Sequence, residues 1–397
     1  MTRSVTLDTL DRRLVHALQI DGRAPFSRIA AVLGVPERTV ARRYHRLRSA
    51  LVVRVVGLVD SARVGMLDWF VRVECAPDAV DALTAALAQR DDTSWLAPLA
   101  GGGRLVCMVR TPAVGADGGR LLFDHLARTP GVRDLAASCV LRPVAGVGGW
   151  AGRTSALDAT EQARLRSWAA ADGEADGADG ADGAEAAEGG GGGGGADRTD
   201  GVGGADGGDG GGGFFGAKGI GGGGGGDGAS GGDGARGAFE WSEGDVRLVG
   251  ELARDGRAEV RELSAVTGWS ASTVRRRIAR LRAAGVLHFE VDVDPALFGS
   301  PVEALLWLEV APSALGRVTG ALARQRPVAF AAVTTGSASV FAMVQCPGTG
   351  ALYDYLAHEL GGLPGIGRTE TALVQRRAKR AGALLLPESP SWRRRRP

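Results

Sequence analysis

Two stretches of the chain, 11–60 and 245–294, align without a gap at a constant offset of 234, and 23 of the 50 aligned residues are identical. The shared residues include the Asp-Gly-Arg-Ala segments at 21–24 and 255–258. Similarity held in one register over this length indicates duplication of a module rather than a shared composition. The chain is therefore expected to fold as two related halves.

The tract between the halves, residues 171–238, is built almost wholly from Gly, Ala and Asp. Such a composition buries too little apolar surface to offset the entropy of ordering the backbone, so a disordered linker is predicted. The tract holds 13 acidic and 3 basic residues, which leaves +12 on the remainder of a chain whose net charge is +2. A basic remainder of this kind attracts a polyanion such as nucleic acid.

The sequence contains no apolar run long enough to span a bilayer, and residues 1–5 lack the apolar core of a signal peptide. A cytoplasmic protein with no membrane partner is therefore expected. The four cysteines, Cys75, Cys107, Cys139 and Cys346, lie far apart in apolar stretches. This spacing favours reduced core residues over disulfides or a metal site, so neither a metal nor a cofactor is expected.

Each half is predicted to begin with three helices. In the first half, Asp8 is suited to cap a helix that Asp21-Gly22 ends, and a second helix is expected from about 27 to 33. Gly34 supplies the turn, and the third helix begins near Pro36. Its apolar positions recur at helical spacing and form the expected core stripe of Val40, Tyr44, Leu47 and Leu51.

The periodicity changes to that of strands at 52–59 and 286–293. Beyond them each half repeats the order strand, helix, strand, strand, helix, strand. The expected elements are 68–75, 79–90, 94–100, 104–110, 120–128 and 132–141 in the first half, and 303–310, 313–324, 328–335, 339–346, 351–360 and 366–375 in the second. This order gives an antiparallel four-stranded sheet with two helices on one face.

The predicted fold class is α+β, with two winged-type helix-turn-helix domains and two ferredoxin-like βαββαβ domains separated by a disordered Gly/Asp-rich linker. The predicted boundaries are 1–60 and 239–294 for the helix-turn-helix domains, 61–150 and 295–380 for the βαββαβ domains, 151–170 for a short helix, 171–238 for the linker and 381–397 for a basic tail.

The third helix of each half has a basic outer face. In a helix-turn-helix this helix enters the major groove, where arginine contacts phosphates and offers a two-pronged donor to guanine. The candidate DNA contacts are Arg38, Thr39, Arg42, Arg43 and Arg46 in the first half, and Ser272, Thr273, Arg275, Arg276, Arg277 and Arg280 in the second. The alternative is a merely solvated helix face. The scarcity of acids in the stripe and the apolar stripe opposite it favour DNA contact.

The first half resembles the N-terminal domain of the Lrp/AsnC (leucine-responsive regulatory protein) transcription factors in three motifs, Leu7-Asp8-x-x-Asp11-Arg12-x-Leu14, Ile29-Ala30-x-x-Leu33-Gly34 and Thr39-Val40-x-Arg42-Arg43. The βαββαβ segments resemble the effector-binding and dimerising domain of that family. The resemblance implies sequence-specific transcriptional regulation, with double-stranded DNA as partner, an amino acid or related metabolite as effector, and homo-oligomers formed through the βαββαβ domains.

The chain departs from the family pattern in two ways that bear on function. Ordinary members carry one copy of each domain and dimerise, so this chain is expected to form a pseudo-dimer in which the sheet of 68–141 packs on that of 303–375. In the family, the glycine turn between strands two and three is followed by an acidic residue near the small-molecule site, and here that acid is missing. The candidate effector residues in this turn are Gly101, Gly103, Arg104, Gly336, Ser337 and Ser339. The alternative is a tight hairpin turn.

Three further segments leave alternatives open. Residues 155–170 resemble the start of a helix-turn-helix first helix and are either a relic of the linker's insertion or a packed extension of the first half. The Arg393–Arg396 run is a phosphate-seeking tail or a solubilising one. The five histidines are dispersed, and no nucleophile or carboxylate recurs beside them in both halves, so no enzymatic activity is expected.

Two classes of function remain. The favoured one is a DNA-binding transcriptional regulator. The other is a ferredoxin-like ligand-binding or enzymatic protein whose helical modules serve assembly only. Binding or turnover of a metabolite without duplex binding would favour the second class.

Overall fold

The structure is a computed structural model. It describes residues 6–50, 52–90, 92–112, 123–146, 156–178, 241–380 and 383–384. Apart from residues 171–178, the predicted linker lies outside the described residues, as do Leu51 and the Arg393–Arg396 run.

Each half begins with three helices, which we call the first head and the second head. The first head consists of α1 (Thr9–Ile20), α2 (Phe26–Leu33) and α3 (Glu37–Ser49), and the second of α7 (Glu243–Arg254), α8 (Val260–Thr267) and α9 (Ala271–Ala283). Asp8 caps α1 and Ser242 caps α7, each in a reciprocal capping box with the residue three positions on. Gly34 and Gly268 end α2 and α8 with φ of +68° and +77°, a conformation that favours glycine.

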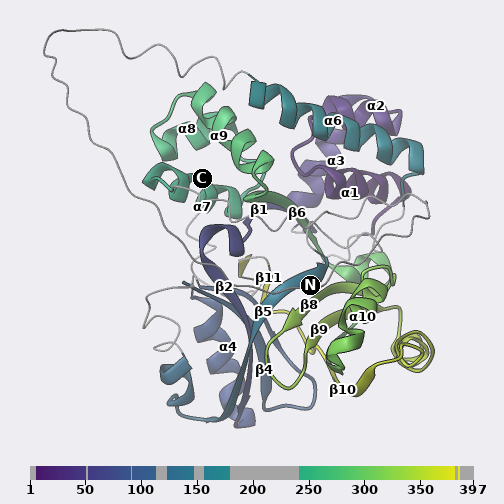
Figure 1. The fold of residues 1–397 in the computed structure, drawn as a ribbon. Helices are drawn as coiled ribbons and strands as arrows, with labels where there is room; N and C mark the ends of the chain where they lie inside the picture. The colour runs from purple at the N-terminus through teal and green to yellow at the C-terminus, as the bar shows by residue number, and fades with distance from the viewer. Residues whose placement is uncertain are drawn as a thin grey trace, which may run out of the picture. The chain divides into compact units, whose positions relative to one another are not determined.

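The strand after each head pairs with its counterpart from the other half. Residues Val53–Val59 form β1 and residues Leu287–Val293 form β6, and the two run antiparallel as a two-stranded sheet (Figure 1). The prediction of winged-type domains is therefore wrong, because a wing needs two strands within one head. Each head supplies a single strand, whose backbone groups are satisfied by the equivalent strand of the duplicate.

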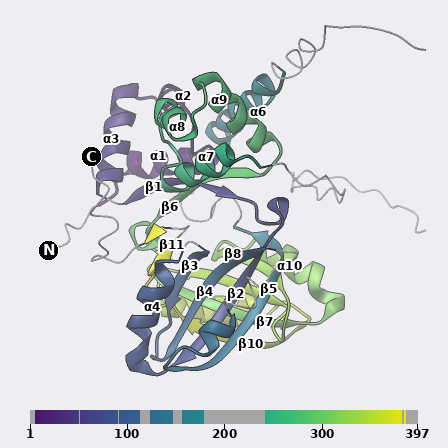
Figure 2. The same ribbon diagram turned by 90° about the vertical axis from the view of Figure 1, so that its left-hand side faces the viewer.

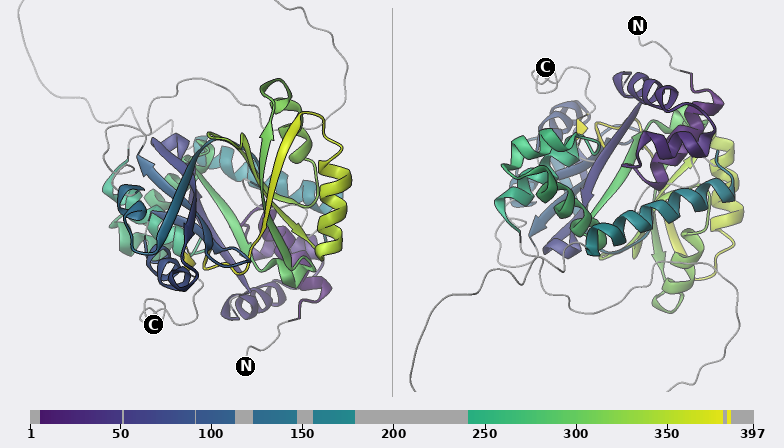
Figure 3. Two further views of the ribbon diagram at one scale, coloured as in Figure 1. Left: turned by 90° about the horizontal axis from the view of Figure 1, so that it is seen from below. Right: turned by 90° about the horizontal axis from the view of Figure 1, so that it is seen from above.

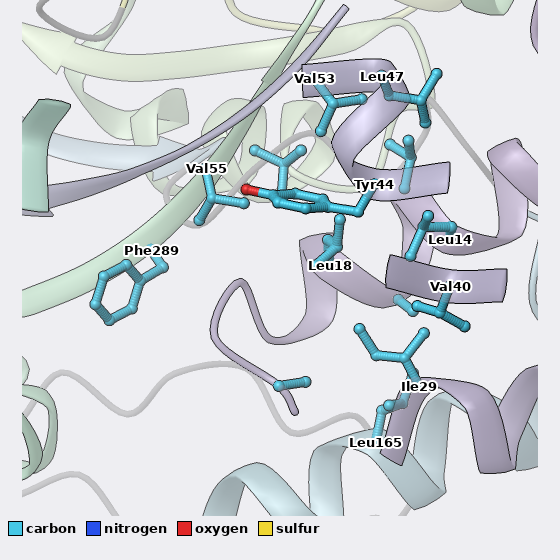
Figure 4. Close-up of a cluster of buried hydrophobic side chains, with 14 of the residues drawn as sticks. Leu14, Leu18, Ile29, Val40, Tyr44, Leu47, Val53, Val55, Leu165 and Phe289 are labelled. Carbon is cyan, nitrogen blue, oxygen red and sulfur yellow. The ribbon is translucent and has the colours of Figure 1, made fainter. Parts of the chain in front are cut away.

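One hydrophobic core runs through both heads. Figure 4 shows Tyr44 of α3 packed near Leu18 and Val55, with Phe289 of β6 on the far side of Val55. The predicted stripe on α3 is confirmed where the structure describes it, since Val40, Tyr44 and Leu47 are buried. The two heads thus share one hydrophobic core and are not two separately packed units.

Each half continues into a four-stranded antiparallel sheet. The first contains β2 (Met66–Cys75), β3 (Thr93–Pro98), β4 (Arg104–Pro112) and β5 (Val132–Ala145) in the order β5-β2-β4-β3, and the second contains β7 (Val302–Val310), β8 (Val328–Thr334), β9 (Val340–Cys346) and β10 (Ile366–Leu373) in the order β10-β7-β9-β8. The identical orders are consistent with the ferredoxin-like arrangement expected from the sequence.

The helices between these strands are α4 (Val80–Ala88), α10 (Leu315–Leu322) and α11 (Thr349–Asp354), the last continuing as the π-helical turn η6 (Tyr355–Leu360). Residues 123–127 form the described part of the helix predicted at 120–128. Short 3-10 turns occupy η1 (Ala62–Val64), η2 (Pro77–Ala79), η4 (Pro295–Phe298) and η5 (Pro312–Ala314). The helices cover one face of each sheet and leave the other face free to meet its counterpart (Figure 2).

The two sheets pack on one another through an aromatic layer, as the sequence predicted for a pseudo-dimer. Phe70 of the first sheet stacks on Phe341 of the second with ring centroids 3.9 Å apart. Strand β5 continues to Ala145, beyond its predicted end at 141, because its last residues pair with β8. At the other edge Ala100 N donates to Leu373 O, and β11 (Lys379–Arg380) pairs with β3 and with β12 (Ala383–Leu384). Figure 3 (left) shows strands of both halves from below.

Helix α6 (Ala159–Ala178) extends eight residues into the tract predicted to be disordered. Alanine is the best helix former, and the first part of α6 is anchored by packing. Leu157 and Leu165 are buried in the head core, and Glu161 forms an ion pair with Arg13 of α1. These contacts favour the packed-extension interpretation of residues 155–170. In the part of the chain that the structure describes, no helix is both long and apolar enough to cross a membrane.

Candidate nucleic-acid interface

The third helix of each head presents its apolar side inward and its basic side outward. In α9 the buried residues include Val274, Ile278 and Leu281, which correspond to the core stripe of α3. Because an α-helix repeats every 3.6 residues, the positions between them project away from the core. The outer face of each helix is therefore the surface available to a large ligand.

The predicted contact residues fall into two groups by exposure. Thr39 and Thr273 are half-buried near the helix starts. The exposed group comprises Arg38, Arg42, Arg46, Ser272, Arg275, Arg276 and Arg280. From Ala271 to Arg282 the outer face of α9 has no acidic residue, and Glu37 is the single acid in α3. Each helix thus presents a cluster of guanidinium groups with few acidic residues on the same helix.

Arg43 and Arg277 turn toward the core and bind buried aspartates. Arg277 donates from Nε to Asp245 Oδ1 at 2.5 Å and from Nη2 to Oδ2 at 2.6 Å. Arg43 donates to both Asp8 and Asp11, at 2.5 Å and 2.9 Å, and Arg46 reaches Asp11 at 2.5 Å. Asp11 and Asp245 are completely buried. These arginines therefore bind the third helix of each head to its first.

The pKa shifts of these residues agree with a role in holding the third helix of each head against the first. Burial alone would raise the pKa of Asp245, but hydrogen bonds from Arg277 and Ser242 outweigh it and hold the pKa below its ordinary value. In the first head, the hydrogen bonds to Asp8 and Asp11 raise the pKa of Arg43. Sequence reasoning missed both aspartates as functional residues. Their identity at equivalent positions of the repeat was the available signal.

A reciprocal pair of arginines joins the two heads. Arg23 donates from Nη1 to Gly256 O at 2.7 Å, and Arg257 donates from Nη1 to Gly22 O at 2.7 Å. The second nitrogen of each guanidinium reaches the carbonyl oxygen of Ala258 or Ala24 in the opposite head. Arg257 also lies 4.4 Å above the ring of Phe26. The orientation of one head relative to the other is therefore held by hydrogen bonds as well as by the β1–β6 ladder.

These junction arginines are half-buried, and their guanidinium groups are engaged in the contacts across the junction. Burial, followed by repulsion from Arg257 and Arg282, lowers the pKa of Arg23 to about 10, so it is still charged at neutral pH. Two ion pairs flank the junction with the same reciprocity, Arg48 with Asp255 at 2.5 Å and Arg282 with Asp21 at 3.2 Å. Sequence reasoning noted the repeated Asp-Gly-Arg-Ala segments and used Asp21-Gly22 as a helix end, but assigned their arginines no role.

The candidate effector residues do not converge on one another. Gly101, Gly102, Gly103 and Gly336 all have positive φ, between +71° and +101°, as tight turns require. A Cβ at Gly103 would lie 2.8 Å from Cys75 O, and one at Gly336 would lie 3.2 Å from Ser138 Oγ. Arg104 approaches Glu370. Ser337 is exposed, and Ser339 Oγ bonds to the backbone N and O of Val310.

The thiols and His16 occupy structural positions. All four cysteines are buried and free, and burial raises the pKa of the Cys107 thiol to about 12. His16 Nδ1 accepts hydrogen bonds from the backbone N–H groups of Ala156 and Leu157. Among the described residues, no three His, Cys, Asp or Glu side chains gather as metal ligands.

Comparison with known proteins identifies the parts of the chain. Residues 7–48 and 242–282 each match the AsnC-type helix-turn-helix domain, and residues 303–384 match the Lrp/AsnC ligand binding domain. The HTH-type transcriptional regulator FL11 of Pyrococcus horikoshii is 29% identical over 133 residues, which are 33% of this chain and 87% of that protein. The HTH-type transcriptional regulator AldR of Mycobacterium tuberculosis is 27% identical over 139 residues, 34% of this chain and 78% of its own.

Among solved structures, the siroheme decarboxylase NirDL matches over 94% of this chain and 93% of its own, with a TM-score of 0.52 and 12% identity. Its complex with an iron-uroporphyrin III analogue gives a TM-score of 0.54 and 13% identity. At this identity the likeness establishes a shared fold alone. The domain matches show that this chain carries the AsnC-type helix-turn-helix domain twice and an Lrp/AsnC ligand binding domain, and the relatives named above are HTH-type transcriptional regulators.

Proposed function

We propose that this protein is a DNA-binding transcriptional regulator that contacts duplex DNA with α3 and α9. The observation that carries the proposal is the pair of exposed, nearly acid-free arginine faces on the third helices of two AsnC-type domains. Guanidinium groups at this density neutralise phosphates and release condensed counterions. The width of the major groove admits a helix bearing such side chains.

The predicted contact residues divide into two roles in this proposal. Arg38, Arg42, Ser272, Arg275, Arg276 and Arg280 contact DNA directly, with Thr39 and Thr273 at the helix starts. Arg43 and Arg277 hold α3 and α9 in position through Asp11 and Asp245. Arg46 combines both roles, because its side chain is 52% exposed although it binds Asp11.

The proposal is tested by mixing the full chain with sheared fragments of its own genome and sequencing what is retained. A small set of discrete loci is expected. The double variant Arg42→Ala/Arg276→Ala should lose them. The matched control, Arg324→Ala/Arg368→Ala, removes the same charge from exposed positions on the sheet half and should retain them. Equal retention by wild type and the Arg42/Arg276 variant would contradict the proposal.

Response to an amino acid or related metabolite is the finer part of the proposal. Its support is the match of residues 303–384 to the ligand binding domain of the family. Repeating the capture with and without individual amino acids tests it, and a shift in the retained loci or in affinity is expected. Sedimentation of the same samples tests whether the chain assembles into homo-oligomers through its βαββαβ domains.

An enzymatic function is the second candidate, supported by the near full-length likeness to the decarboxylase NirDL. The direct test is incubation of the purified chain with siroheme under anaerobic conditions, followed by mass spectrometry of the tetrapyrrole. Loss of carboxyl groups without genomic capture would favour the enzyme. An unchanged tetrapyrrole together with discrete genomic loci would favour the regulator.

A further inference from the structure

The two heads are related by a twofold axis within one chain. Strands β1 and β6 pair with Val56 opposite Glu290, two residues that are equivalent in the sequence repeat. The pairs at either end of the ladder, Val53 with Val293 and Val59 with Leu287, exchange under the same equivalence. A ladder that maps onto itself in this way has its twofold axis at the central pair.

The contacts beside the ladder obey the same symmetry. The bonds of Arg23 and Arg257 across the junction exchange with one another, and so do the ion pairs of Arg48 and Arg282. Seen from above in Figure 3 (right), the first head in purple and the second in green lie on either side of the paired strands. The outer faces of α3 and α9 are therefore in inverted orientation, as for a protein that reads two half-sites on opposite strands.

The side chains on these symmetric faces differ, however. At four positions of helical spacing, α3 carries Arg38, Ala41, Arg42 and His45, and α9 carries Ser272, Arg275, Arg276 and Ala279. One of the four equivalent pairs, Arg42 and Arg276, is identical. Arginine selects guanine through a two-pronged bond, whereas serine accepts several bases and alanine offers an apolar contact. The two faces therefore present different donor patterns to the groove.

Packing adds to this inequality. Helix α6 packs against α9 of the second head and against α1 and α2 of the first. Ala279 on α9 is 7% exposed, while its counterpart His45 on α3 is exposed. At this position α9 therefore has a buried methyl group where α3 offers an exposed imidazole.

Building on the proposed function, we infer that the preferred duplex is an inverted pair of two unequal half-sites. The half-sites share the base read by Arg42 and Arg276 and differ at the bases facing the remaining three positions. Two identical heads on a twofold axis read identical half-sites, so a perfect palindrome satisfies them best. In this chain the backbones of the two heads are related by the twofold axis, whereas the side chains that face the groove differ between them. The chain therefore sits on its operator in one orientation.

The test is selection of duplexes by the full chain from a library with two randomised segments separated by spacers of several lengths. The expected product is an inverted pair of unlike half-sites with centres about one helical turn, or a multiple of it, apart. Replacing either half-site by a copy of the other should weaken binding about tenfold or more, since each wrong base pair has a cost of that order.

A symmetrised variant provides the matched comparison. This variant gives α3 the outer residues of α9 through three substitutions, Arg38→Ser, Ala41→Arg and His45→Ala. All three positions are exposed or half-buried and lie away from the core and from the ion pair of Arg43 with Asp11. Selection with this variant should shift to a palindrome built from the second half-site. Thermal unfolding near that of the wild type would show that both proteins are folded.

The outcomes separate the inference from the function beneath it. Enrichment of a perfect palindrome, a direct repeat or a single half-site by the wild-type chain would overturn the inference while leaving DNA binding intact. An unchanged preference in the symmetrised variant would also overturn it. Enrichment of no duplex at all would overturn the proposed function itself.

Discussion

Arg277 of α9 holds the fully buried carboxylate of Asp245 in α7 through two hydrogen bonds, and the two residues lie 32 positions apart in the sequence. The carboxylate also accepts from the backbone N–H of Ser242 and so caps α7. One buried charge thus fixes both the start of the first helix and the rotation of the third. The first head repeats the arrangement, since the Asp11 carboxylate accepts from the backbone N–H of Asp8 and from Arg43.

Replacing Asp245 by Asn should therefore destabilise the second head. The substitution removes the negative charge that pairs with Arg277 in a largely buried position, a change expected to lower the free energy of unfolding by about 3 kcal/mol. Urea denaturation checks this. The matched control is Glu243→Gln, at a 90% exposed carboxylate beside Arg247, which should change stability by less than about 0.5 kcal/mol. Equal stability of the two variants would contradict the stabilising role of the ion pair between Arg277 and Asp245.

His16 makes the docking of α6 dependent on pH. Its Nδ1 accepts from the N–H groups of Ala156 and Leu157 at 3.1 Å and 3.0 Å, so the ring is bound in its neutral form. Burial, and after it the positive charge of Arg166, lower the pKa of His16. Glu161 acts in the opposite direction, and its carboxylate is paired with Arg13. A lowered pKa means that this stabilisation is fully present above about pH 6.5, the unfolded value, and is lost as the pH falls below it.

Hydrogen exchange of residues 156–169 at several pH values measures this effect. Protection should fall in the wild type as the pH drops below about 6.5, the unfolded value. In His16→Ala it should be low at every pH. The variant His358→Gln, at an exposed histidine of η6, should behave as wild type. Protection in the wild type that does not change between pH 5 and 8, values bracketing the histidine range, would contradict the role of His16.

Gly256 lies at a close approach of the two heads. A Cβ there would lie 2.9 Å from Val55 Cγ1 and 3.0 Å from the carbonyl carbons of Val55 and Val56. Two of these three contacts are backbone, so Gly256→Ala should lower stability by about 1–3 kcal/mol through overpacking. Gly250→Ala is the matched control, since Gly250 lies inside α7 with open space around it. That change should raise stability by about 0.5–1 kcal/mol. Differential scanning calorimetry distinguishes the two signs.

Phe341 anchors one sheet to the other. It is 1% exposed and stacks on Phe70 across the layer between the sheets. Phe341→Ala should cost about 3–5 kcal/mol because it leaves a cavity in the aromatic layer. Adding Phe70→Ala should cost less than the sum of the two single changes, as expected for residues in contact. Strict additivity in chemical denaturation would argue against the stacked pair, and Tyr353→Ala at a 67% exposed ring serves as the neutral control.

Local signals made the heads predictable. Asp8, Asp21 and Gly34 mark helix ends through caps and a left-handed turn, which depend on a few neighbouring residues. The duplication then supplied the second head, and the repeated strand and helix periodicity supplied both sheets. The resemblance to the Lrp/AsnC family was likewise visible in three short motifs.

The features that sequence reasoning missed depend on contacts between distant residues. The pairing of β1 with β6 involves strands more than 200 positions apart, and either strand alone reads as part of a wing. Arg43 and Arg277 look like their exposed neighbours until Asp11 and Asp245 are placed beneath them. The length and docking of α6 follow from the surface offered by α1, α2 and α9. The position of a residue along a helix predicts which face of the helix it lies on. The residue that it contacts on that face depends on the tertiary fold.

The most direct test of the central claim is the salt dependence of duplex binding, followed by fluorescence anisotropy on a genomic fragment retained by the full chain. We expect log K to fall linearly with log salt, with a slope of about 0.9 for each phosphate neutralised. Arg42→Ala/Arg276→Ala should weaken binding and make that slope shallower by about 2, while Arg324→Ala/Arg368→Ala should leave both unchanged. Identical affinity and slope for wild type and the Arg42/Arg276 variant, or no binding even at low salt, would contradict the account.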